Sequence, residues 1–175
     1  MGKAGIRVAI VAVIILGTVG YKLFFVDSDE VRNFNDRLVD MIERSNLRFE
    51  GLTDFIDQYT DGKKVNVEAM SPQRERLAES IRTDLKLLKR TTVPDDELCK
   101  NLHRTCVAYI RNSRDIADKY QEVFAYISQH NPGNAADFDV FLKPITPLLE
   151  KDEQLLEAAI AAQEKLVKKF GLKIE

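Results

Sequence analysis

The chain has 175 residues, of which 45% are hydrophobic and 31% are charged, a composition that is ordinary for one globular domain with an appendage. Its formal net charge is −2, and the part that follows residue 26 carries 23 basic against 28 acidic groups. A mildly acidic body binds a polyanion poorly, so nucleic-acid binding is not expected. The small number of glycines and prolines, and the lack of sustained β-type alternation after residue 30, predict an all-α chain.

The N-terminal stretch has the pattern of a single membrane-spanning helix. Residues 8–26 are apolar or small except for Lys22, and these 19 positions would extend about 28 Å as a helix, close to the ~30 Å hydrocarbon thickness. Basic Lys3 and Arg7 precede this run and acidic residues follow it. The positive-inside bias then places the N-terminus in the cytoplasm and the remainder on the outer, periplasmic side. We therefore expect a signal-anchor at residues 1–26 that holds the chain in the cytoplasmic membrane.

A cleaved signal peptide is the alternative interpretation of this stretch. Thr18 and Gly20 are small residues at the spacing that a signal peptidase recognises. The apolar run nevertheless continues through residues 23–26, beyond the usual apolar region of about 7 to 15 residues. We therefore prefer the uncleaved anchor and leave cleavage open.

Residues 27–175 are expected to form one helical-bundle domain. Apolar residues recur in steps of four and three up to Gly62, which predicts a first helix at about 28–60. Ser71 followed by Pro72 has the pattern of an N-cap and a first helical residue, so the second helix is predicted at 72–90. The third is predicted at 95–130. Four long helices with short connections indicate an antiparallel four-helix bundle.

The last helix, predicted at 135–170, contains two prolines. Pro144 and Pro147 lack the backbone N–H that a helix interior uses, so a short helix to Lys143, a kink near the prolines and a long second part are expected. Gly171 follows a lysine-rich turn and is a suitable helix stop.

The second helix carries an excess of basic residues, and two interpretations of this excess remain open. One is a basic stripe that receives an acidic partner. The other is a solvated face whose cations pair with acids on neighbouring helices. The residues concerned are Arg74, Arg76, Arg82, Lys86, Lys89 and Arg90.

The third helix has the longest regular pattern, a seven-residue repeat of the kind found in coiled coils. This repeat keeps one stripe of side chains facing partner helices. The predicted inward positions are Cys99, Leu102, Cys106, Tyr109, Ser113, Ile116, Tyr120, Val123, Ile127 and His130. A flanking row at His103, Ile110, Ala117 and Phe124 widens the stripe, which suits a multi-helix bundle.

Three residues of this stripe are the candidate metal ligands. Cys99, His103 and Cys106 are spaced so that a helix brings them to one side, and thiolate with imidazole suits zinc or copper. The alternative is that they fill space in the core, since a buried cysteine commonly packs as a small hydrophobe. A disulfide would need an irregular helix start, because seven helical residues separate the Cα atoms by about 10.5 Å, whereas a disulfide spans at most ~7 Å. We therefore expect free core thiols.

Other chemistry lacks its sequence motifs. The chain has no Cys-x-x-Cys-His, no Glu-x-x-His pair and no Gly-rich phosphate loop, so an enzyme is not predicted and no cofactor is expected. Tyr109, Ser113 and Tyr120 would place hydroxyl groups on the seam, which could line a small ligand cavity. The competing interpretation is that these hydroxyls bond to backbone carbonyls and set the helix register.

The function that these patterns favour is a non-catalytic, membrane-anchored interaction or scaffold subunit of an envelope complex. It would contact the lipid bilayer through residues 8–26 and bind a protein partner or a second copy of itself. A ligand-sensing or carrier bundle is the first alternative, and a metal- or haem-binding bundle is the second.

Overall fold

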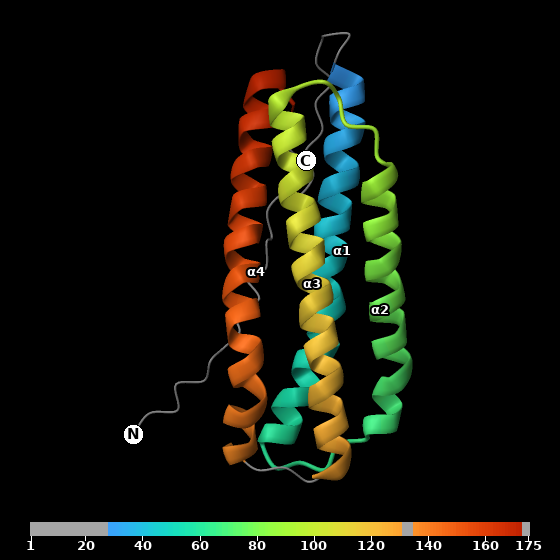
Figure 1. Cartoon of the computed structure of the whole chain (residues 1–175), viewed down its shortest axis with the longest axis vertical. Coiled ribbons are helices and arrows are strands. Elements are labelled where there is room, and N and C mark those ends of the chain that lie inside the picture. The colour runs from blue at the N-terminus through green and yellow to red at the C-terminus, as the bar shows by residue number, and fades with distance from the viewer. Residues whose placement is uncertain (1–27, 131–134, 173–175) are drawn as a thin grey trace, which may run out of the picture.

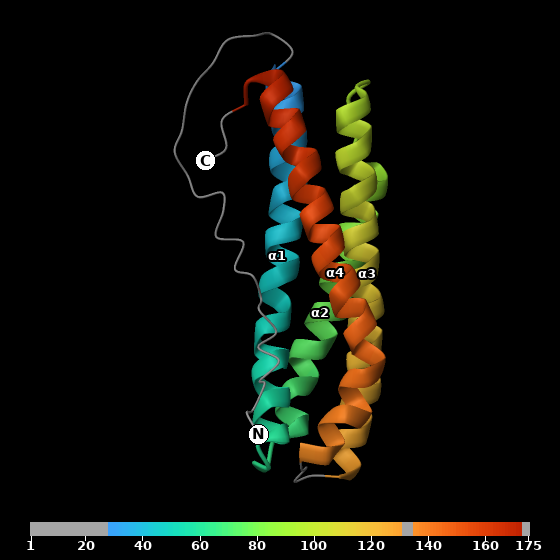
Figure 2. The same cartoon turned by 90° about the vertical axis from the view of Figure 1, so that its left-hand side faces the viewer.

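The computed structural model describes residues 28–130 and 135–172, and its elements in this part of the chain are four long helices. They are α1 (Ser28–Thr60), α2 (Val67–Arg90), α3 (Glu97–Gln129) and α4 (Ala135–Phe170). Successive helices run in opposite directions, so the prediction of an all-α antiparallel bundle is confirmed (Figure 1). The start of α1, the connection between α2 and α3 and the end of α4 lie at one end of the bundle (Figures 1 and 2).

The predicted start of the second helix is wrong, because α2 begins at Val67 and not at Pro72. Its N-cap is Asn66, whose side-chain oxygen accepts a hydrogen bond of 3.2 Å from the Ala69 backbone N–H. Pro72 therefore lies inside the helix, on its exposed side. The unpaired carbonyl that a proline leaves four residues earlier belongs to Glu68, which is also exposed. The added turn buries Met70, which offsets the cost of the proline.

The predicted break in the last helix is also wrong, because α4 is continuous from Ala135 to Phe170 through Pro144 and Pro147. Both prolines are exposed, and the helix continues past them although neither can donate a backbone N–H to the preceding turn. Between them Ile145 is fully buried. The helix ends where predicted: Gly171 has a φ of 60°, and the Leu172 N–H donates to the Val167 carbonyl at 3.0 Å.

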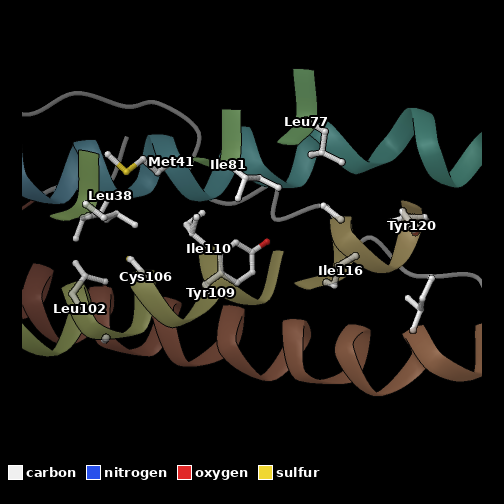
Figure 3. Close-up of a cluster of buried hydrophobic side chains, with 14 of the residues drawn as sticks. Leu38, Met41, Leu77, Ile81, Leu102, Cys106, Tyr109, Ile110, Ile116 and Tyr120 are labelled. Carbon is white, nitrogen blue, oxygen red and sulfur yellow. The ribbon is translucent and has the colours of Figure 1, made fainter. Parts of the chain in front are cut away.

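The predicted stripe of α3 is confirmed as the centre of the core. Each of its inward positions from Cys99 to Ile127 is buried, as are three of the four flanking residues, the half-buried His103 being the fourth. Figure 3 shows Leu38 of α1, Ile81 of α2 and Ile110 of α3 within one apolar cluster. Because α3 contacts all three other helices, its repeat needs a broad apolar face.

His130 is a correction to that stripe, since it is exposed. The helix ends at Gln129 and His130 is its C-cap, so the seam does not extend to this residue. Its Nδ1–H donates to the Tyr126 carbonyl at 3.0 Å, and its ring stacks on the Tyr126 ring with centroids 3.8 Å apart.

The helices do not pack as four equal neighbours. In residues 28–130 and 135–172, α1 and α3 each contact every other helix, whereas α2 and α4 make no contact with each other. In this part of the chain α2 therefore packs against α1 and α3. The predicted anchor at residues 1–26 lies outside the described residues, and none of the helices described is apolar enough over a sufficient length to cross a membrane.

Candidate functional site

An open groove lies on the outer surface between α2 and α3, where the two helices run antiparallel (Figure 1). Its volume is about 320 Å³. Two turns of α3 and the last turns of α2 form its walls. The lining residues are Leu85, Leu88, Lys89, His103, Arg104, Val107, Ala108 and Arg111.

The floor of the groove is aliphatic. Leu88 is almost fully buried, whereas Leu85, Val107 and Ala108 are partly exposed. Partly exposed aliphatic groups in a concave surface favour an occupant that removes them from water, by roughly 25 cal/mol for each Å² of apolar surface covered.

The rim of the groove is cationic, and no acidic residue lines it. Lys89, Arg104 and Arg111 are exposed, and none of them forms an ion pair within the described part of the chain. Arg104 and Arg111 are seven residues apart on α3, so they lie along one edge of the groove, about 10.5 Å apart along the helix axis. The groove therefore combines an apolar floor with unpaired positive charge on both sides.

His103 is the one predicted site residue that lines this groove, and it is bonded to the neighbouring helix. Its Nε2–H donates to the Leu88 carbonyl at 2.9 Å, and its ring lies 6.4 Å from that of Phe34, centroid to centroid. The Leu88 carbonyl belongs to the last turn of α2, where it also accepts a hydrogen bond of 3.3 Å from the Thr91 N–H. His103 therefore fastens the end of α2 to α3.

Cys99 and Cys106 are both buried free thiols. Burial raises the pKa of Cys99 to about 11, with a further contribution from the nearby Asp96 charge, and burial raises the pKa of Cys106 to about 12. Figure 3 shows Cys106 among Leu38, Met41 and other apolar side chains of the core. Across the described residues, no three His, Cys, Asp or Glu side chains are grouped to hold a metal ion. The predicted metal face stays a prediction.

The three hydroxyl residues proposed for a ligand cavity have partners inside the core. Ser45 of α1 donates to Ser113 at 3.1 Å, and Ser113 donates to the Tyr109 carbonyl at 3.1 Å. The ring of Tyr120 lies 6.0 Å from that of Phe49. The Tyr109 hydroxyl donates to the Asp152 carboxylate. These contacts are those of side chains that fix the register of packed helices.

Sequence reasoning missed a polar cluster between α3 and α4, consisting of the buried Tyr109 and Asn112 and the half-buried Asp152. The Asn112 side-chain amide donates to the Leu148 carbonyl at 2.9 Å and to Asp152 at 3.0 Å. Burial raises the pKa of the Asp152 carboxyl above its usual value, against the opposing effect of hydrogen bonds from Asn112 and Tyr109. Burial also raises the pKa of the Tyr109 hydroxyl, with a contribution from the Asp152 charge. The missed signal is that Asp152 lies seven residues after Ile145 and seven before Ala159, both buried.

Comparison with protein-family models, with curated proteins and with solved structures finds no significant match.

Proposed function

We propose that the chain is a non-catalytic, membrane-anchored interaction subunit. Residues 8–26 would cross the cytoplasmic membrane with the N-terminus in the cytoplasm, and the bundle would bind a protein on the outer, periplasmic side. The observation that carries the binding role is the groove between α2 and α3, which pairs a partly exposed aliphatic floor with three unpaired cations. Such a surface has the composition of a protein-binding site, and the sequence offers no catalytic motif to compete with it.

The topology supports an anchored arrangement. α1 begins at Ser28, immediately after the predicted span, so a membrane would lie at the end of the bundle that holds the connection between α2 and α3. The groove involves the last turns of α2 and the first half of α3. It would therefore be in the half of the bundle nearer the membrane, within reach of another membrane-held protein.

Membrane fractionation tests the anchor. The chain should stay in the pellet after alkaline carbonate extraction, and a variant without residues 1–26 should become extractable. A full-length chain that washes off with carbonate would rule out the anchor.

Native electrophoresis after mild detergent extraction tests the binding role. We expect a complex larger than the monomer, and cross-linking in intact membranes should give the same product. A monomer under every extraction condition would argue against an interaction subunit.

No specific observation favours the two alternatives over this proposal. The hydroxyls of Tyr109 and Ser113 are bonded within the core, and Cys99 and Cys106 are buried thiols. A sensing or carrier bundle and a metal or haem bundle therefore stay predictions of the sequence.

A further inference from the structure

We propose that the groove between α2 and α3 binds an amphipathic helix of a partner protein, one whose apolar face is flanked by acidic residues. This inference rests on the proposed function as an interaction subunit and names the chemistry of its partner. It follows from the shape of the groove, from the positions of its cations and from the exposed face of α2 beside it.

The shape of the groove fits a helix laid against two others. Two antiparallel helices form its walls, and residues 103–111 of α3 cover about 12 Å along the axis, or roughly two helical turns. A helix that lies in such a groove presents apolar side chains at spacings of three, four and seven residues. Two successive turns of a partner would cover Leu85, Val107 and Ala108.

The face of α2 beside the groove is exposed. α2 packs against α1 on one side and α3 on the other, and in residues 28–130 and 135–172 no further helix covers its outward face. Along that outward face Arg82, Lys86 and Lys89 follow each other in steps of four and three, with Lys89 at the rim of the groove, and all three are exposed.

The charge pattern distinguishes a peptide from a lipid headgroup. Lys89 is on one wall, whereas Arg104 and Arg111 are about 10.5 Å apart along the other wall. A single phosphate headgroup can approach one of these cations closely but cannot neutralise all three. Acidic residues seven apart on a helix repeat at the same spacing as Arg104 and Arg111, so they can face both arginines at once.

No described side chain forms an ion pair with the three cations of the groove. Lys89, Arg104 and Arg111 have no ion-pair partner among the described side chains, although Arg114, Lys119 and Lys169 do. The basic residues of α2 therefore divide into two groups. Arg74 is used internally, since it lies 4.9 Å from the Phe124 ring centroid and bonds to Gln121, whereas Lys89 is available to a partner.

The test measures binding of a designed peptide to the full chain purified in a neutral detergent. The probe is a fluorescent helical peptide with leucines at spacings of three and four and glutamates seven apart on both flanks. The matched control peptide has lysine at every glutamate position. We expect the glutamate peptide to bind at least about tenfold more tightly, and its affinity to fall steeply with added salt.

Variants of the chain locate the binding site. The double reversal Arg104→Glu with Arg111→Glu should weaken binding of the glutamate peptide about tenfold or more, and should allow the lysine peptide to bind. The control, Arg76→Glu with Lys151→Glu, makes the same change in net charge at exposed positions outside the groove lining and should leave affinity within about twofold. Ala108→Trp fills the groove without changing its charge and should also weaken binding, and circular dichroism verifies that each variant is folded.

Several outcomes would overturn the proposal. They are equal binding of the two peptides, unchanged binding after the double reversal, and equal losses from the groove and control reversals. Groove-dependent binding of a dispersed short-chain anionic phospholipid, with no binding of the peptide, would assign the site to lipid instead.

The proposed function and the groove can fail separately. If the chain binds the peptide through the groove but forms no native complex, only the proposed role as an interaction subunit is contradicted. If the chain binds no peptide and its native complex is unaffected by the double reversal, only the proposal that the groove binds a partner helix is contradicted.

Discussion

Asn112 of α3 and Asp152 of α4 are joined by a side-chain hydrogen bond of 3.0 Å, inside the most extensively packed pair of helices. The same carboxylate accepts a hydrogen bond from the Tyr109 hydroxyl, and the Asn112 amide also donates a hydrogen bond to the Leu148 carbonyl. A one-turn slip of α4 along α3 would break all three bonds and leave their polar groups buried. The cluster therefore selects one register among those that the apolar stripe alone would allow.

Replacing Asp152 separates hydrogen bonding from charge. Asp152→Ala leaves the Tyr109 hydroxyl and one Asn112 N–H without a partner, so the free energy of unfolding should fall by about 1–3 kcal/mol. Asp152→Asn keeps an acceptor of the same shape and removes the half-buried charge, so stability at pH 7 should be equal to or above that of the wild type. Urea denaturation followed by circular dichroism compares the two variants, and a greater loss in the asparagine variant would contradict this account.

The pH dependence of stability follows from the direction of the Asp152 shift. Its pKa is raised in the folded state, so its favourable contribution is complete below the ordinary Asp pKa and is lost as the pH rises through the folded value. The wild type should therefore be less stable relative to Asp152→Asn as the pH increases over this range. Thermal unfolding at several pH values measures the difference, which should shrink in acid.

Asp96 should show the opposite trend. Its carboxylate caps α3 by accepting the Leu98 N–H at 2.9 Å and also bonds to Lys169 of α4, and these bonds lower its pKa. Its contribution is present above the ordinary Asp pKa and is lost as the pH falls through the lower folded value. Asp96→Ala should cost about 1 kcal/mol at pH 7 from loss of the cap, whereas Asp96→Ser, which retains a cap, should cost less.

The two cysteines should resist thiol reagents while the protein is folded. With their pKa values raised to about 11 and about 12, Cys99 and Cys106 carry almost no thiolate at pH 8, and both side chains are buried. A colorimetric thiol assay should report no fast-reacting group in the native chain and two in urea. Rapid modification of the native protein, or an internal disulfide seen in a mass spectrum of unreduced protein, would contradict this arrangement.

The apolar repeats predicted the bundle because each helix must bury one apolar face against its neighbours. The stripe from Cys99 to Ile127 has the spacing of a helix that contacts several others, and each helix follows the same physical rule. The errors occurred where local rules compete with packing. Ser71 and Pro72 have the pattern of a helix start, but Asn66 caps the helix and Met70 contributes to the core, so α2 begins earlier.

The candidate site was harder to predict because it depends on which helices are neighbours. The excess of basic residues in α2 was visible in the sequence, but the partners of each cation were not. Lys89 faces a groove only because α3 lies beside α2 with Arg104 and Arg111 turned the same way. Asp152 was missed for a related reason: a carboxylate within an apolar repeat is recognisable only once Asn112 and Tyr109 are seen to bond to it.

The length of the helices sets the distance between the two ends of the bundle. α1 contains 33 residues and spans about 50 Å from Ser28 to the turn that begins after Thr60. The groove lies near the Ser28 end of this span, whereas the turn between α1 and α2 lies at the far end. The bundle thus holds these two surfaces at a fixed separation, so a partner bound in the groove and a second molecule bound at the far turn would be kept apart by most of its height.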